Sequence, residues 1–426
     1  MNFFMYLINY IFNQAVFVIG IVIIIGTIVQ KKSWNQIISS TFKGMIGFLM
    51  ITTGAQSLGM ALLPLQPMLA KIFHFRITVP DIANVQMHSM VGIGTEMALI
   101  FTFGFAMNIL LARFTRFKYV HLSAHVSFFY AGLITALLKF GTHLPTIPLV
   151  FVGSILLGCY MTFTCAYIAP LMKNVKGGEG FTLAHSSSIG ILISALVGKI
   201  VGRGSKDLEE LKLPKSLNFL RDMTTALTFV MTIMFLAIAL IAGPSWVMDH
   251  ASNGRDIISF SLMNGLQFGL WITVIITGVR MMLSEIIPAF HGVAEKVIPN
   301  ATPGLDIPLL FPYYPTSVII GFIMSLTSGL VGMSILGFIH YPVVVFPALI
   351  PTFFTGAITA IFGNSTGGRR GAVIGSLLNG FILIFGQALL LPMIGTYAPV
   401  MRILSETDYC FYGPILGALL KMMGLI

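Results

Sequence analysis

Long apolar runs, each close to the length that crosses a lipid bilayer, constrain the fold of this chain more than any other feature. A helix needs about 20 apolar residues to cross a hydrocarbon core of about 30 Å. We therefore predict an all-α polytopic membrane protein with about 11 transmembrane helices. The runs cover residues 8–30, 38–64, 91–112, 120–140, 146–172, 223–247, 257–289, 315–338, 341–364, 371–395 and 411–426.

Composition supports this interpretation and narrows the class of function. Hydrophobic residues make up 56% of the chain and charged residues 9%, whereas about 25% of a soluble domain is charged. The net charge of +10 lies in short clusters between apolar runs, which is typical of membrane topology and not of a nucleic-acid footprint. A channel, a transporter, a membrane enzyme and a scaffold are all compatible with this composition.

The cysteines and the first residues predict no metal, no cofactor and no cleaved signal. The cysteines Cys159, Cys165 and Cys410 form no CxxC motif and show no histidine spacing typical of zinc. We therefore expect neither a disulfide framework nor a metal site. Residues 1–32 lack a basic region before their apolar stretch and lack a small-residue cleavage site, so we interpret them as a retained membrane helix.

A twelfth apolar segment, residues 180–202, opens with a glycine- and serine-rich stretch that carries His185. Such an opening favours a half-helix or re-entrant segment buried in protein over a lipid-facing span. With the N-terminus outside and this segment not crossing, most lysines and arginines fall in cytoplasmic loops, as the positive-inside rule predicts. The outside then keeps only Lys71, Arg76, Lys139, Arg255 and Arg402.

Three short motifs recur in order at a nearly constant offset of about 224 residues, which indicates an internal repeat. The predicted topology inverts one copy relative to the other, and inverted repeats are typical of alternating-access transporters with a midplane site. We predict a first repeat over residues 1–202, a basic cytoplasmic loop over 203–222 and a second repeat over 223–426. The motif pairs are Pro80-Asp81-Ile82 with Leu305-Asp306-Ile307, Gly132–Ala136 with Gly356–Ala360, and Gly153–Gly158 with Gly375–Gly380.

Ionisable residues inside membrane segments usually face a cavity or a partner, so they are the candidate functional residues. His185 lies at the start of the predicted half-helix, where free backbone amides and hydroxyls can bind a polyol. The alternative is a histidine that only caps the helix. His125 precedes Phe128 and Phe129, an aromatic wall for the apolar face of a sugar, or it is a satisfied core histidine.

Asp306 is the catalytic candidate, because it lies in an irregular segment between apolar runs. A carboxylate there can bind a substrate hydroxyl and accept its proton during phosphoryl transfer. Alternatively, it satisfies the amides of a turn, and its repeat counterpart Asp81 has the same two interpretations. Arg280 and Glu285 are expected to form a structural charge pair, directly or with Glu96.

Several polar motifs are specific even where the helices are not. Residues 178–190 read GEGFTLAHSSSIG, residues 207–214 DLEELKLP, residues 279–285 VRMMLSE, residues 303–306 PGLD, residues 350–359 IPTFFTGAIT and residues 367–372 GGRRGA. Together they resemble the ascorbate-specific EIIC family of the phosphoenolpyruvate-dependent phosphotransferase system. The similarity runs from Phe12-Asn-Gln to about residue 390 and so covers nearly the whole chain.

This resemblance implies a homodimeric permease of the bacterial inner membrane. A substrate-carrying core domain would move against a V-motif domain in an elevator type of alternating access. A phosphocysteine on a separate cytoplasmic EIIB protein, itself charged by EIIA, would phosphorylate the sugar that this chain presents. The basic segment 199–221 is a candidate docking surface for EIIB, because complementary charge steers association.

The resemblance also implies a set of substrate-binding residues. His125, His185 and Asp306 match the ligand-binding histidines and the aspartate of the family. The remaining ligand positions are occupied here by other side chains, which removes several hydrogen-bond partners of ascorbate; a lost partner in a buried site costs about 1–3 kcal/mol. Those substrate-binding positions are Ile82, Ala83, Phe129 and Ser186.

Three functions follow as hypotheses. The first is a permease that takes up L-ascorbate, or a related polyol or sugar acid, and delivers it as a phosphate ester. The second is an ion-coupled secondary transporter of an unmodified solute, with Glu96, Glu285 or Asp306 carrying protons or Na⁺. The third is a sensor or scaffold that keeps the fold without transport. The chemistry of the product distinguishes the first two.

Overall fold

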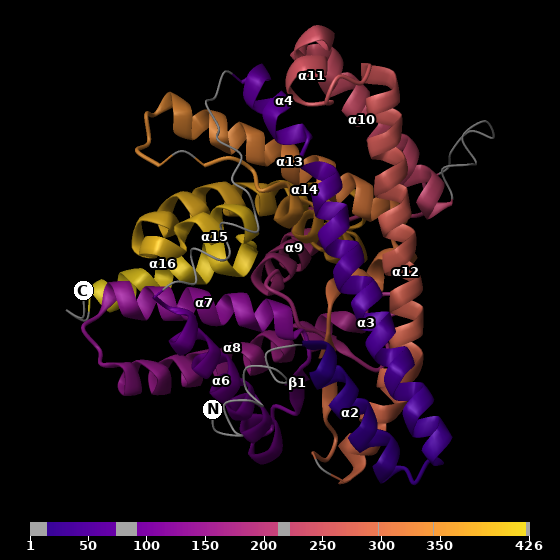
Figure 1. Ribbon diagram of the computed structural model, residues 1–426, viewed down its shortest axis with the longest axis vertical. Coiled ribbons are helices and arrows are strands. Elements are labelled where there is room, and N and C mark those ends of the chain that lie inside the picture. Colours follow the sequence, from indigo (N-terminus) through magenta and orange to yellow (C-terminus); the bar gives the residue numbers. More distant parts are fainter. Residues whose placement is uncertain (1–14, 74–91, 212–221, 297, 344, 423–426) are drawn as a thin grey trace.

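A computed structural model describes residues 15–73, 92–211, 222–296, 298–343 and 345–422 (Figure 1). Within these ranges the chain is almost entirely helical, with one small sheet of three short strands. Seven of the described helices are long and apolar enough to cross a membrane. The prediction of a helical, multi-pass membrane protein is therefore confirmed in its class, while the count of 11 crossings stays a prediction.

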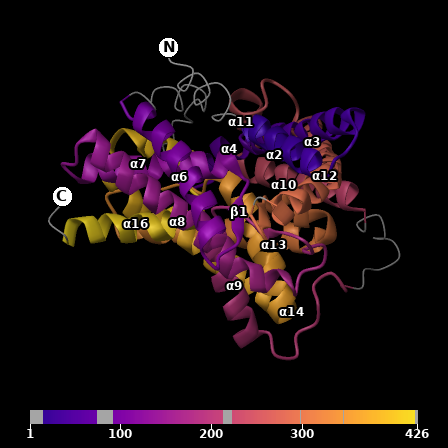
Figure 2. The ribbon, with the colours of Figure 1, turned by 90° about the horizontal axis from the view of Figure 1, so that it is seen from below.

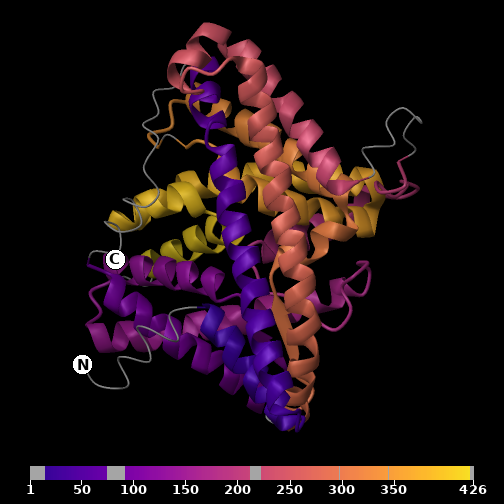
Figure 3. The ribbon, with the colours of Figure 1, turned by 45° about the vertical axis from the view of Figure 1, so that its right-hand side comes forward.

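A first helix group contains long helices that run along the longest axis of the molecule, together with two short helices at one end of it (Figures 1 and 3). In it, α12 packs against α2, α3 and α10. The backbones of α3 and α12 come close together where small residues face each other. A Cβ added to Gly278 would lie only 2.7 Å from the carbonyl oxygen of Gly47, which shows how close this approach is. The members are α2 (Ala15–Val29), α3 (Trp34–Leu62), α4 (Leu65–Ile72), α10 (Met223–Ala242), α11 (Pro244–His250) and α12 (Ile257–Lys296).

Aspartates cap the starts of two helices in this group. The Asp222 carboxylate accepts hydrogen bonds from the hydroxyl of Thr225 at 2.6 Å and from its N–H at 2.8 Å. Asp256 accepts in the same way from the hydroxyl and N–H of Ser259. Because these bonds favour the ionised form, they hold the pKa of both carboxyls below the usual range.

A second helix group carries the polar side chains. Its helices are α6 (Gly94–Phe114), α7 (Ala124–Gly141), α8 (Thr146–Met172), α9 (Ser188–Val201), α13 (Pro315–Phe338), α14 (Leu349–Leu390), α15 (Ala398–Leu404) and α16 (Thr407–Met422). Its strands are β1 (Tyr119–His121), β2 (Thr182–Leu183) and β3 (Thr302–Leu305), and its 3₁₀ helices are η3 (Ile307–Tyr313), η4 (Leu391–Met393) and η5 (Gly395–Tyr397). Figure 2 shows α9 and α14 side by side, projecting between the first group and α6 to α8.

Helix α14 is two helices folded back on each other at Gly368. Gly368 has φ +57° and ψ −152°, a conformation that is almost restricted to glycine. Beyond this turn the two arms run together, and the Asn379 amide donates to the Thr355 hydroxyl at 2.8 Å. The turn coincides with the boundary predicted between the runs 341–364 and 371–395.

The segment that follows α9 is bound to the α14 turn. The backbone N–H of Arg369 donates to the carbonyl of Lys206 at 2.9 Å. The Asn364 side chain donates to Asp207 at 2.6 Å and accepts from the N–H of Leu208 at 2.8 Å. The described part of the predicted loop 203–222 is therefore anchored, whereas residues 212–221 lie outside the described residues.

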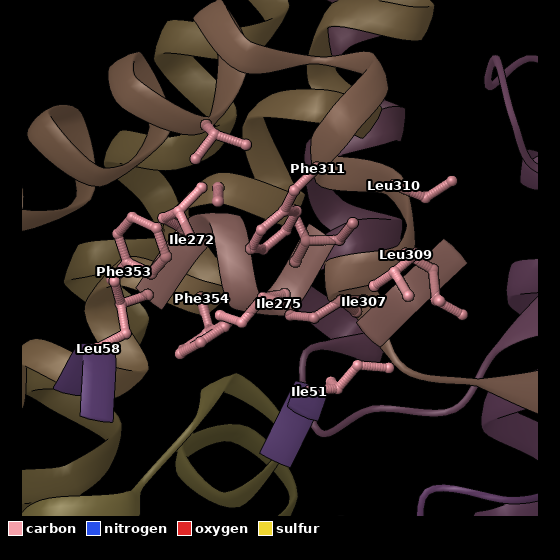
Figure 4. Packing of buried hydrophobic residues seen from close by; sticks show 14 of the residues in the cluster. Ile51, Leu58, Ile272, Ile275, Ile307, Leu309, Leu310, Phe311, Phe353 and Phe354 are labelled. Carbon is pink, nitrogen blue, oxygen red and sulfur yellow. The ribbon is translucent and has the colours of Figure 1, made fainter. Parts of the chain in front are cut away.

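An apolar interface joins the two helix groups (Figure 4). Ile51 and Leu58 of α3 and Ile272 and Ile275 of α12 come from the first group. Opposite them lie side chains of η3 and α14, among them Ile307, Leu309, Leu310, Phe311, Phe353 and Phe354. All of these residues are buried, so hydrophobic contact holds the groups together here.

Candidate functional site

The three strands bring distant parts of the chain to one place. They are parallel, in the order β1-β3-β2, with Tyr119 opposite Thr302 and with both His121 and Thr182 opposite Gly304. The carboxyl ends of parallel strands meet at one edge of a sheet, which is where such folds commonly place ligand-binding groups. The residues that follow these ends carry His125, His185 and Asp306.

Asp306 lies between the two predicted histidines. Its Oδ2 is 3.4 Å from His125 Nε2, and its Oδ1 is 3.7 Å from His185 Nε2. Oδ1 also accepts the N–H of Ile307 at 2.7 Å, which caps η3. The turn-capping and the substrate-binding interpretations of Asp306 are thus compatible. Oδ1 caps η3, whereas Oδ2 contacts only His125 among the residues that the structure describes.

Glu406 is a further member of this cluster that the sequence analysis did not identify. Its Oε2 lies 3.4 Å from His185 Nδ1 and accepts a hydrogen bond from the Ser186 hydroxyl. Side-chain exposure is 5% for His185, 14% for Asp306, 15% for Glu406 and 37% for His125. Two carboxylates therefore flank the buried His185, and His125 is the member most open to a ligand.

The starts of α9 and α16 meet at this cluster. Asp408, at the start of α16, accepts from the N–H of Ile189 at 2.8 Å and from the Ser188 hydroxyl at 2.5 Å. In return, the Asp408 N–H donates to the carbonyl of Ser186 at 2.8 Å. The Tyr160 hydroxyl of α8 donates to Asp408 at 2.8 Å, so a buried carboxylate caps α9 from another helix.

The other predicted site residues have different outcomes. The Ser186 hydroxyl is bound to Glu406. Phe129 is partly buried on α7, one turn after His125, and its ring lies 5.9 Å edge-on from that of Phe128. Asp81, Ile82 and Ala83 lie outside the described residues, so their predicted roles stay predictions.

Among the described residues, Arg280 pairs with neither Glu285 nor Glu96, so the predicted charge pair is wrong. The Glu96 carboxylate pairs with Lys139 at 2.5 Å, and no ion pair of the described chain includes Arg280 or Glu285. Positions five apart on a helix point about 140° away from each other. Arg280 is accordingly exposed, whereas Glu285 is half-buried.

A cavity of 410 Å³ lies at the opposite end of the sheet. Tyr119, Phe181 and Thr302, at or beside the amino ends of the strands, line it together with Ile287 and Phe290 of α12. The cavity is therefore bordered by both helix groups. Lys173 also lines the cavity. The cavity therefore lies on the side of the membrane that the basic loops predict to be cytoplasmic.

The chain combines membrane-length helices with a buried cluster of carboxylates and histidines. The residues of this cluster lie where the long helices are interrupted. This combination defines a multi-pass membrane protein of the transport class. The chain belongs to the EIIC-GAT family, described as the PTS system sugar-specific permease component, whose family model matches residues 10–408. The resemblance of the polar motifs is thereby confirmed at the level of the family.

One curated relative is similar along most of the chain. It is the "Ascorbate-specific PTS system EIIC component" of Mycoplasma pneumoniae (strain ATCC 29342 / M129 / Subtype 1), with 24% identity over 435 residues. The alignment covers 89% of this chain and 65% of the relative. This chain thus spans about two thirds of that protein's length.

Proposed function

We propose that this chain is the carbohydrate permease (EIIC) subunit of a phosphotransferase system. The observation that carries the proposal is the meeting of Asp306 with His125 and His185 inside the helical bundle of a chain that belongs to the EIIC-GAT family. The sugar is bound at this cluster and phosphorylated by a phosphocysteine on a separate EIIB protein, which EIIA charges.

The chemistry needs a positioned hydroxyl and an acceptor for its proton. In the transfer, the P–S bond of the EIIB phosphocysteine breaks, a P–O bond to the sugar hydroxyl forms, and the cysteine leaves as a thiolate. The hydroxyl proton passes to Asp306, while the imidazoles of His125 and His185 hold neighbouring hydroxyls. This division of work suits phosphoryl transfer, in which a protein contributes mainly position and electrostatics.

The two helix groups correspond to the V-motif domain and the core domain of an elevator transporter, and two chains form a homodimer in the bacterial inner membrane. The apolar interface between the groups (Figure 4) supports such a motion, because apolar contacts lack the directional hydrogen bonds that fix one register. The cavity bordered by both groups would change its shape as they move.

We further infer that α16 is a second re-entrant half-helix, in place of the predicted crossing 411–426. Its first residues are tied to the start of α9, because the Asp408 N–H donates to the Ser186 carbonyl and the Asp408 carboxylate accepts from Ile189 N–H. It begins at Thr407 against α9, and Gly413 lies next to Leu390 at the end of α14. The two inverted repeats would then contribute one half-helix each, α9 and α16, to the substrate site.

An ion-coupled transporter of an unmodified solute is the second candidate. The observation in its favour is the spatial arrangement of Asp306, His185 and Glu406, in which the histidine lies between two carboxylates. Such groups carry protons in transporters. The two functions differ in their product, because only the permease delivers a phosphate ester.

The test is uptake into vesicles that contain the purified chain and are loaded with phosphoenolpyruvate and the cytoplasmic proteins of the system. The lumen then represents the cytoplasm, and radioactive carbohydrates are added outside. We expect phosphorylated product inside, and no accumulation when EIIB is omitted. Unmodified solute that accumulates without EIIB, in response to a proton or Na⁺ gradient, would replace the proposal with the ion-coupled transporter.

A further inference from the structure

A third histidine, His121, lies beside the cluster of Asp306, His125 and His185. We propose that His121 is a further substrate-binding residue, whose Nε2 forms a hydrogen bond with a hydroxyl group of the carbohydrate. This inference rests on the proposed permease function, which it deepens by adding a residue to the substrate site.

Strand β1 carries His121 to the cluster. His121 is the last residue of β1, and its register partner in β3 is Gly304. Paired residues of parallel strands point to the same face of a sheet, and so do residues two apart along one strand. Asp306 follows Gly304 by two residues in an extended backbone, with φ −77° and ψ 154°. His121 and Asp306 therefore point to the same face, and the His121 side chain lies close enough to His125 and His185 to interact with them electrostatically.

Residues outside the cluster fix the position of His121. Its backbone N–H donates to Asn108 Oδ1 at 3.0 Å, and the Asn108 amide donates to the Thr162 hydroxyl at 2.8 Å. Asn108 thereby ties β1 to both α6 and α8. The imidazole Nδ1 forms a hydrogen bond of 3.0 Å with the Ser127 hydroxyl of α7. The backbone and one edge of the ring are thus held, which sets the direction of the other edge.

The nitrogen on that other edge, Nε2, has no hydrogen-bond partner among the described residues, although His121 is only 1% exposed. Buried polar atoms of native proteins nearly always form a hydrogen bond. Of the three buried side-chain atoms without a partner in the described part of the chain, two are His121 Nε2 and His125 Nδ1. His185 is almost as buried, as expected for a pocket that encloses a small ligand. Unpaired polar atoms therefore concentrate at the proposed substrate site.

A hydroxyl group is the ligand that suits this nitrogen. A neutral imidazole has one donor and one acceptor nitrogen, and the Ser127 hydroxyl can donate to Nδ1 or accept from it. A ligand hydroxyl can pair with Nε2 in either case, because it both donates and accepts. Two predicted binding positions offer no free group of this kind, since Phe129 is apolar and the Ser186 hydroxyl is bound to Glu406. His121 supplies a partner for a hydroxyl that those positions leave unpaired.

Two substitutions separate the two ring nitrogens. The His121→Asn amide takes the place of Nδ1 and keeps the contact with Ser127, whereas the longer His121→Gln side chain places its amide near the position of Nε2. Purified protein in detergent is titrated with L-ascorbate, xylitol and galactitol, and dissociation constants are measured by thermal shift. For the compound that the wild type binds most tightly, we expect His121→Asn to bind at least about 10-fold more weakly and His121→Gln to remain within about 3-fold of the wild type.

Three controls separate a direct contact from a structural effect. His143→Asn makes the same change at an exposed residue between α7 and α8 and should leave the dissociation constant unchanged. The melting temperature without ligand shows whether each variant is folded. Monodeoxy derivatives of the bound compound report the contact itself. The derivative without the hydroxyl that pairs with His121 should bind equally to the wild type and to His121→Asn, whereas a structural effect would weaken every derivative by the same factor.

A structure of the wild type with the carbohydrate bound tests the inference without any variant, should His121→Asn not fold. It should place a hydroxyl oxygen within about 3.2 Å of His121 Nε2. A carbohydrate that lies out of hydrogen-bond reach of Nε2 would overturn the inference.

The inference also fails if His121→Asn binds the compound as tightly as the wild type, if every derivative is weakened equally, or if the wild type binds none of the three compounds. Its failure is distinguishable from failure of the proposed function. A phosphate ester formed by the wild type in the vesicle assay supports the permease function whatever the role of His121, because that assay does not depend on which residue binds which hydroxyl.

Discussion

The substitution Asp408→Asn offers the most detailed test of how the starts of α9 and α16 are held together. The carboxylate accepts three hydrogen bonds, from Ile189 N–H, the Ser188 hydroxyl and the Tyr160 hydroxyl. Asparagine keeps one oxygen, which can still accept from Ile189. Its NH₂ group takes the place of Oδ2 and faces two hydroxyls that had donated to that atom.

The magnitude follows from these contacts. Each hydrogen bond to a charged group contributes about 1.5–3 kcal/mol, so loss of two predicts about 3–6 kcal/mol. Removal of a buried charge relieves part of its desolvation cost, which lowers the expected loss of unfolding free energy to about 2–4 kcal/mol. We expect the loss of stability to be largest at the junction of α9 with α16, where the three hydrogen bonds lie.

Two assays test this prediction: denaturant unfolding of the purified protein in detergent, and, separately, hydrogen exchange of the α9 amides in the folded protein. We expect a lower unfolding midpoint and faster exchange at the start of α9 for Asp408→Asn. Asp249→Asn, at an exposed residue of α11, is the matched control and should behave as the wild type. A stability within about 0.5 kcal/mol of the wild type, with unchanged exchange at Ile189, would refute this account of the junction.

Two further predictions concern the α14 turn and the segment bound to it. Gly368→Ala should destabilise the protein by about 1–3 kcal/mol, since φ is +57° and a Cβ would lie 2.5 Å from the Lys206 carbonyl oxygen. Gly204→Ala, at φ +74° with no atom near its Cβ, should cost less, and equal midpoints in thermal unfolding would contradict the reasoning. Glu209→Gln should accelerate hydrogen exchange at Thr316 and Ser317, whose N–H groups donate to its carboxylate at 3.0 and 2.7 Å. Exchange unchanged relative to Glu210→Gln would show that this cap does not stabilise α13.

The sequence predicted the membrane class and part of the site for a physical reason. The length and apolarity of the runs depend on the bilayer and not on packing, so they are readable without a structure. His125, His185 and Asp306 were candidates because ionisable groups are rare in membrane segments, and the structure brings all three together.

The rest depended on tertiary contacts that leave little local pattern. The strands have two to four residues, which is too short for the alternation that identifies a strand. Glu406 and Asp408 precede the apolar run 411–426, so a search for ionisable residues inside the runs did not select them. If the predicted repeat is correct, Ser405–Asp408 at the start of α16 correspond to Ser186–Ser188 at the start of α9, and a comparison of these two serine-bearing segments is the signal that could have identified them.

The most direct test of the proposed function is a single-turnover phosphoryl transfer. Phosphorylated EIIB carrying ³²P is mixed with the purified permease and with a carbohydrate that binds to it, and the phosphate ester is counted. The account predicts ester formation with the wild type and with Asp249→Asn, and a loss of at least about 100-fold with Asp306→Asn, as expected for a proton acceptor. Ester formation by Asp306→Asn at the wild-type rate would contradict the central role of Asp306.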